Sequence, residues 1–158
     1  MRNQLSILTV CLSIFAFMSC KSTKSTTSGG ELVTKMTVQQ PVKVGSPVMV
    51  TFTVTNTSAK ELKFCKWHTP FEGFKNSIFD IKNSKGEDVR YKGIMAKRIM
   101  PPPAEAYITV APGKTEKGSI DLLTAYDLTV PGKYTIVYQS SGISGLEKVN
   151  DATFTISE

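Results

Sequence analysis

Few side chains in this sequence are of a type that could carry out covalent chemistry. Cys65 and His68 stand three positions apart, and His68 is the only histidine of the chain. A thiolate beside an imidazole is a nucleophilic pair. In a strand, however, side chains three positions apart point to opposite faces of the sheet, which would separate the two groups. We therefore expect Cys65 to be a small buried hydrophobe and His68 a polar residue at a strand end. An enzyme built on this pair is the disfavoured alternative.

Patterns for a metal or a cofactor are also missing. A zinc site needs three or four converging Cys, His or carboxylate ligands, and the sequence contains neither HExxH nor CxxC. Its acidic residues do not form the ladder of a calcium loop. It has no glycine-rich phosphate loop and no Gly-x-Ser-x-Gly elbow. The sequence predicts no catalytic residue, no cofactor and no metal.

Cys20 has a different chemical prospect, set by the residues before it. Residues 1–4 carry a positive charge, and residues 5–18 form an apolar run, shorter than the about 20 residues that span a bilayer. The run ends at Phe17-Met18-Ser19-Cys20, which resembles the lipobox where a bacterial prolipoprotein is acylated on cysteine and cut just before it. The resemblance implies a signal peptide at 1–19 and lipid on Cys20, and the alternative is an ordinary secretory signal.

The segment after Cys20 is predicted to be a tether. Residues 20–30 are rich in Ser, Thr and Gly, and a flexible chain of this length spans roughly 17 Å. Lys21 stands where an Asp would resemble an inner-membrane retention signal, which favours the outer membrane, and no acidic run follows to favour export to the surface. We expect a protein of the cell envelope that is bound to the membrane through the lipid on Cys20 and faces the periplasm.

The rest of the chain, residues 31–158, shows the period-2 alternation of β-strands. Val48, Val50, Phe52 and Val54 alternate with Met49 and three threonines, so the first set should face a core. Turn signals such as Ala-Pro-Gly and Pro-Gly separate the other segments. The sequence predicts an all-β fold, an immunoglobulin-like antiparallel sandwich of two sheets and about eight strands. The expected strands lie at residues 31–38, 48–55, 62–67, 77–82, 89–91, 107–110, 115–122, 134–138 and 154–156.

Two residues near position 120 should shape a corner of this sandwich. Asp121 is expected to cap a short helical turn. Tyr126 is expected to turn inward and bond the backbone, as in the tyrosine corner of such folds. Both are folding features.

A basic, proline-ended segment in the second half of the domain has no place in this strand pattern. Three consecutive prolines cannot donate ladder hydrogen bonds and favour extended backbone, which would carry the preceding Ile and Met to an exposed position. Apolar side chains there would form a contact surface for a partner. The alternative is that they fold back as a satellite core. The residues concerned are Ile94, Met95, Lys97, Arg98, Ile99, Met100, Pro101, Pro102 and Pro103.

Charge gives little reason to expect nucleic acid as a partner. The net charge is +6, but the basic residues are spread along the chain. Nucleic-acid binding needs basic residues clustered with stacking aromatic side chains. The sequence predicts no nucleic-acid partner.

Several stretches resemble the non-catalytic β-domain that precedes the protease domain in deuterolysin-like and peptidyl-Lys metalloendopeptidases, the aspzincins. They are residues 62–73, 89–98, 111–113, 121–122, 126–128 and 131–134, and Gly-Ile-Met-Ala-Lys-Arg is the most specific part. The zinc-binding motif of that family has no counterpart here, so no catalytic residue carries over. The resemblance implies a propeptide-like module that inhibits or chaperones a secreted or periplasmic peptidase in trans. The alternative is a structural or assembly lipoprotein of the envelope.

Overall fold

The computed structural model describes residues 31–158. The signal peptide at 1–19, the lipidated Cys20 and the tether to residue 30 lie outside the described residues, so these three expectations stay predictions. Within the described part, no helix is long and apolar enough to cross a membrane.

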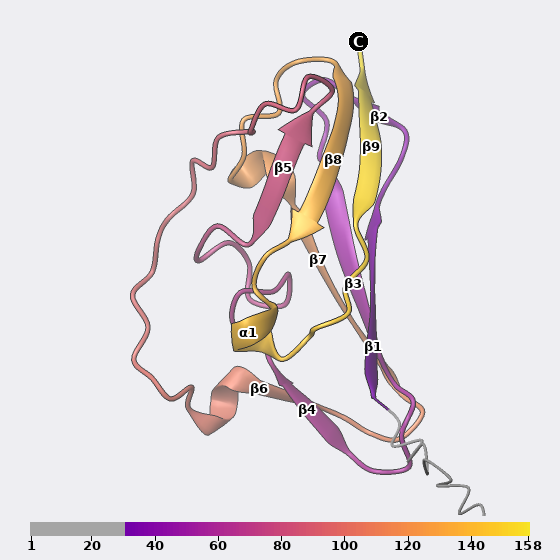
Figure 1. Cartoon of the computed structure of the whole chain (residues 1–158), viewed down its shortest axis with the longest axis vertical. Coiled ribbons are helices and arrows are strands. Elements are labelled where there is room, and N and C mark those ends of the chain that lie inside the picture. The colour runs from indigo at the N-terminus through magenta and orange to yellow at the C-terminus, as the bar shows by residue number, and fades with distance from the viewer. Residues whose placement is uncertain (1–30) are drawn as a thin grey trace, which may run out of the picture.

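In the described part of the chain, nine strands form three sheets (Figure 1). A three-stranded antiparallel sheet has the order β1-β3-β7, and a four-stranded sheet has the order β2-β9-β8-β5. The remaining two strands, β4 and β6, form an antiparallel ribbon of their own. The strands are β1 (Leu32–Val38), β2 (Val42–Lys43), β3 (Met49–Asn56), β4 (Leu62–Cys65), β5 (Phe79–Asn83), β6 (Tyr107–Val110), β7 (Thr115–Asp121), β8 (Gly132–Tyr138) and β9 (Ala152–Ser157).

This architecture confirms the all-β, immunoglobulin-like fold class and differs from the prediction in detail. The N-terminal segment switches sheets, because β1 pairs with β3 whereas β2 pairs in parallel with β9. The β4-β6 ribbon is a third unit that the two-sheet expectation did not include. The strand expected at 89–91 is wrong, because the only β-bridge of that stretch is the isolated one between Tyr91 and Tyr126.

The core lies where the alternation in β3 predicts it. Val48, Val50, Phe52 and Val54 are completely buried, as are Ile136 on β8 of the facing sheet and Ile78 just before β5. Aromatic rings extend this core, and Phe52 meets the Tyr138 ring edge-on with 5.0 Å between centroids. Burial of each such side chain contributes about 1.5–3 kcal/mol.

Asp121 caps a helical turn as predicted, and Tyr126 turns inward to bond the backbone, but its partner Phe79 lies 47 positions upstream on β5 and not in a local corner. The Tyr126 hydroxyl donates to the carbonyl oxygen of Phe79 at 2.8 Å and accepts the N–H of Phe79 at 3.0 Å. Asp121 accepts the N–H of Leu123 at 3.0 Å and caps the short 3-10 helix η2 (Leu122–Thr124). Its Oδ1 also accepts the N–H of Val48 at 2.8 Å, which ties the corner to the entry of β3.

A long connection joins β5 to β6 and carries the basic, proline-ended segment. Figure 1 shows it as the trace that runs outside the sheets, along one side of the molecule from the end near the C-terminus to the β4-β6 ribbon. It ends in the 3-10 helix η1 (Ala104–Ala106). A second short helix, α1 (Ser141–Ser144), lies after β8.

Candidate binding surface

The connection between β5 and β6 exposes the apolar side chains that the sequence singled out. The exposed fractions are 58% for Ile94, 68% for Met95, 89% for Ile99 and 62% for Met100. We call these four residues the loop face. They do not fold back as a satellite core, and their use as a contact surface for a partner stays a prediction. Isolated exposed apolar residues are ordinary, but four on one segment mark a candidate contact surface.

The charged residues on the connection itself, from residue 89 to residue 104, are all basic. Residues 89–104 contain no Asp or Glu, and Lys92 and Lys97 are exposed to solvent. Lys92 lies 3.8 Å from the Asp127 carboxylate, and Arg90 lies 3.4 Å from it. These pairs involve exposed side chains and contribute about 0–1 kcal/mol each.

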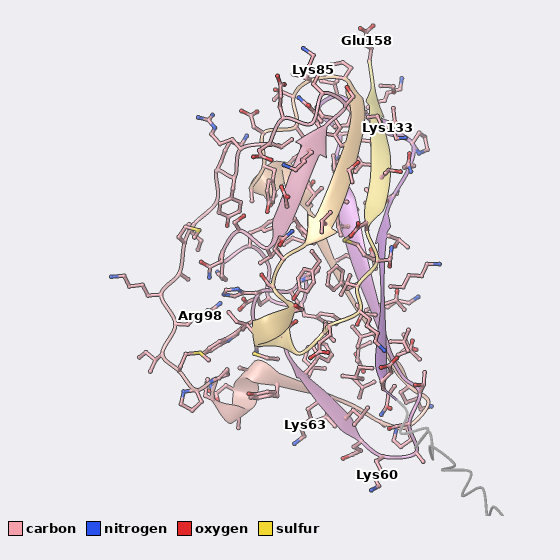
Figure 2. The ribbon with its side chains drawn as sticks, viewed as in Figure 1. Lys60, Lys63, Lys85, Arg98, Lys133 and Glu158 are labelled. Carbon is pink, nitrogen blue, oxygen red and sulfur yellow. The ribbon has the colours of Figure 1, made fainter. Side chains whose placement is uncertain are left out.

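Arg98 is the one basic side chain of the segment that turns inward, on the side that faces the sheets (Figure 2). Its guanidinium donates to Oε2 of Glu72 at 2.6 Å and lies 4.6 Å from the centre of the Trp67 ring. The Glu72 side chain is only 8% exposed. Oε1 of the same carboxylate accepts the N–H of His68 at 2.7 Å. Glu72 therefore holds the exposed connection with one oxygen and the turn after β4 with the other.

A glycine in the three-stranded sheet fixes the position of that turn. A Cβ on Gly118 would lie 2.7 Å from Cγ of Phe71, so only glycine lets the ring rest on β7. The Phe71 ring also meets the Phe64 ring edge-on, with 5.0 Å between their centroids. Phe71 thus packs between β4 and β7, and Glu72 is the next residue in the chain.

Asn76 ties the same turn to the connection a second time. Its buried side-chain amide donates to Nε2 of His68 at 3.0 Å and to the carbonyl oxygen of Ala96 at 3.3 Å. The backbone N–H of Ala96 donates to the carbonyl oxygen of Lys75 at 2.7 Å. The Tyr91 hydroxyl donates to the carbonyl oxygen of Ile94 at 2.8 Å. The loop face therefore stands on a segment that is fastened at several points.

Cys65 and His68 are not arranged as a nucleophile and its base. Cys65 is buried against Trp67 and Ala106, and burial raises the pKa of its thiol, which disfavours the thiolate. The His68 ring bonds Asn76 instead. The sequence argument separated the two side chains by placing both on one strand, and that placement is wrong. Strand β4 ends at Cys65, and His68 lies beyond it in a turn with a φ of 58°. Strand parity does not apply there.

Within residues 31–158, no group of three or more His, Cys, Asp or Glu side chains converges on a point that could hold a metal ion. The residues that sequence reasoning missed are Trp67, Glu72 and Asn76, which support the loop face from below. Arg98 was included as part of the surface, whereas the structure makes it a support. Glu72 precedes Arg98 by 26 positions, and no local pattern links residues so far apart.

Comparison with known proteins places this fold. A model of the immunoglobulin-like domain matches residues 34–144. The chain belongs to the immunoglobulin-like domain family. This assignment agrees with the two facing sheets.

Relatives of this immunoglobulin-like chain include secreted proteins and proteases. It is 28% identical to an uncharacterized secreted protein of Arthroderma benhamiae over 133 residues, 80% of this chain and 68% of that one. It is 28% identical over 108 residues, 68% of this chain, to a neutral protease 2 homolog of Arthroderma gypseum. It is 29% identical over 92 residues, 58% of this chain, to an extracellular protease of Aeromonas hydrophila. These similarities agree with the sequence resemblance to a protease-associated β-domain.

The chain spans only a minor part of the two proteases. The matched region is 28% of the Arthroderma gypseum protein and 25% of the Aeromonas hydrophila protein. The similarity thus concerns one segment of each. The Arthroderma benhamiae relative is a secreted protein, and the Aeromonas hydrophila relative is an extracellular protease.

Proposed function

We propose that this immunoglobulin-like domain is a propeptide-like binding module that engages a peptidase through the loop face and inhibits or chaperones it in trans. The observation that carries the proposal is a set of four exposed apolar side chains on a segment fastened through Arg98 and Asn76. The similarity to segments of a neutral protease 2 homolog and of an extracellular protease supports the class of partner.

The energetics of the loop face suit a specific contact. Full burial of an aliphatic or thioether side chain stabilises an interface by about 1.5–3 kcal/mol. Association also costs the ordering of loops and side chains, and a segment that is already fixed loses less conformational freedom on binding. The three prolines that follow Met100 stiffen the backbone further.

The proposal includes a location. Lipid on Cys20 would hold the module at the cell envelope, on the periplasmic face of the outer membrane, because an anchor of more than one acyl chain is effectively permanent. Replacing Cys20 with serine is expected to move the full chain from the membrane to the soluble fraction of lysed cells. Retention of the Cys20→Ser protein in the membrane fraction would contradict the anchor.

A titration against a deuterolysin-like peptidase tests the binding function. Residues 31–158 carry all nine strands and the core, so this segment can be used in solution. We expect saturable binding, together with either a fall in peptidase activity or a rise in the yield of refolded peptidase. Absence of binding, or binding without either effect, would contradict the proposal.

A matched pair of variants assigns the binding to the loop face. The double variant Ile99→Ser/Met100→Ser removes two exposed apolar side chains and should weaken binding about tenfold or more, which corresponds to about 1.4 kcal/mol. Val130→Ser is the control, because Val130 is 64% exposed yet lies in the turn before β8. Equal losses in the two variants would refute the assignment. Crosslinking in envelopes that returns structural proteins and no peptidase would favour an assembly lipoprotein instead.

A further inference from the structure

One amide group joins the only histidine of the chain to the segment that bears the loop face. Nδ2 of Asn76 donates to Nε2 of His68 at 3.0 Å and to the carbonyl oxygen of Ala96 at 3.3 Å. Nε2 accepts a hydrogen bond only when the imidazole is neutral and its proton sits on Nδ1. The bond between Asn76 and the ring therefore depends on the protonation state of His68.

Protonation of the ring forces Asn76 to choose between its two partners. The imidazolium is a donor at both nitrogens, so Nε2 can then meet only an acceptor. If Asn76 turns its amide to present Oδ1 to the ring, its NH₂ group leaves the carbonyl oxygen of Ala96. If Asn76 does not turn, two donors face each other in a buried place and neither finds an acceptor, which is unfavourable. In either case the attachment of Ala96 is weakened.

The charged and titratable groups around His68 come from four elements. Glu72 lies in the same turn and Arg98 on the connection, and their opposite charges act on the ring in opposite directions. On β8, the Tyr138 hydroxyl donates to the carbonyl oxygen of His68 at 2.9 Å. Cys65, at the end of β4, is buried and favours its neutral form. An imidazolium here would also compete with Arg98 for the single carboxylate of Glu72.

We propose that His68 is an acid-sensitive latch: protonation of its ring releases the hold of Asn76 on Ala96 and loosens the segment that carries the loop face. The latch would regulate the surface described under the proposed function, and its biological meaning rests on that function. The latch itself is a property of this domain and can be measured without a partner.

The direction of the pH dependence follows from the surroundings of the ring. Burial lowers the pKa of His68 below its ordinary value of 6.5, with Glu72 opposing this shift and Arg98 adding to it. The folded domain thus binds fewer protons at His68 than the unfolded chain does. Stability from this site is fully present above pH 6.5 and is lost as the pH falls through the lowered value. The latch is closed at neutral pH and opens on the acid side.

Two unique side chains make the experiment specific. His68 is the only histidine and Trp67 the only tryptophan of the chain, so ring protons of His68 report its titration by NMR and fluorescence reports Trp67 alone. Trp67 is 8% exposed beneath the guanidinium of Arg98. Loosening of the segment should admit acrylamide, an uncharged quencher, to the indole. We expect the quenching constant of residues 31–158 to rise about twofold or more between about pH 7.5 and about pH 5.

Two variants test whether His68 and Asn76 cause the change in quenching. His68→Asn keeps a residue that tolerates a φ of 58° and does not titrate, so its quenching constant should not change with pH. Asn76→Ala removes the shared amide, so its quenching constant at neutral pH should already match the acid value of the unmodified domain. A quenching constant that stays flat while NMR shows His68 becoming protonated would overturn the latch. The same pH-dependent rise in His68→Asn would overturn it as well.

A binding measurement separates this inference from the proposed function. If acid changes the quenching of Trp67 as expected but no deuterolysin-like peptidase binds at any pH, the latch stands and the proposed function fails. If peptidase binds through the loop face with the same affinity when His68 is neutral and when it is protonated, the proposed function stands and regulation by the latch fails.

Discussion

Replacing Arg98 with alanine should destabilise the domain by about 2 kcal/mol, more than an ordinary surface substitution. The change removes the cation that lies 2.6 Å from Glu72, whose side chain is 8% exposed, and the guanidinium over Trp67. Breaking a fully buried pair costs about 3–5 kcal/mol, and an exposed pair contributes about 0–1 kcal/mol.

The structure places the Arg98–Glu72 pair between those limits. The Arg98 side chain is 25% exposed, which lowers the cost through solvent screening. Contact with the Trp67 ring adds about 0.5–1 kcal/mol. Nε of Arg98 is buried without a hydrogen-bond partner among the described residues, so alanine also removes an unsatisfied donor and offsets part of the loss. These contributions together leave a net cost of about 2 kcal/mol.

Urea unfolding followed by far-ultraviolet circular dichroism measures this cost without relying on Trp67. With a slope of about 1–3 kcal/mol per molar urea for a domain of this size, the midpoint should fall by roughly 1 M. Lys97→Ala is the matched control, because the adjacent Lys97 is exposed and makes no ion pair among the described residues. It should stay within about 0.5 kcal/mol of the unmodified domain. Equal midpoints for the two variants would refute the role that we assign to Arg98.

Two further predictions concern the core. Tyr126→Phe should lower the free energy of unfolding by about 1–3 kcal/mol, because it removes both hydrogen bonds to the Phe79 backbone in a buried place. Tyr91→Phe is the control and should cost less, because it loses a single hydrogen bond in a more exposed place. The reverse order in thermal unfolding would contradict the role of Tyr126. In residues 31–158, Cys65 is the only cysteine, and burial raises the pKa of its thiol, so it should react with a thiol reagent at about pH 8 only after the domain unfolds; rapid labelling of the folded domain would count against this.

The fold class could be predicted from the sequence because the signal for it is local. Alternation at residues 48–54 puts one face of β3 in the core, and all four inward residues are buried. The β2 strand could not be predicted, because two residues carry no periodicity. The parallel pairing of β2 with β9 depends on where the chain crosses between sheets. The stretch 89–91 has the composition of a strand, yet it forms only one isolated bridge, between Tyr91 and Tyr126.

The loop face was only half predictable. The sequence shows its apolar residues and the three prolines, but it allows the apolar side chains to be either exposed or buried. What decides between the two is the attachment of the segment through Arg98 and Asn76, which hold it over the turn after β4. Phe71, the residue before Glu72, packs on β7 at Gly118, which is far away in the sequence.

The sequence by itself therefore determined the all-β class, the core face of β3 and the cap at Asp121, because periodicity and turn residues act over a few neighbouring positions. It also predicts a lipid on Cys20, which lies outside the described residues. Only the tertiary structure decided that the loop face is exposed, that Arg98 supports it and that one amide of Asn76 joins it to His68. Ion pairs and shared hydrogen bonds act over a few ångströms in space, and the residues that make them stand far apart in the chain.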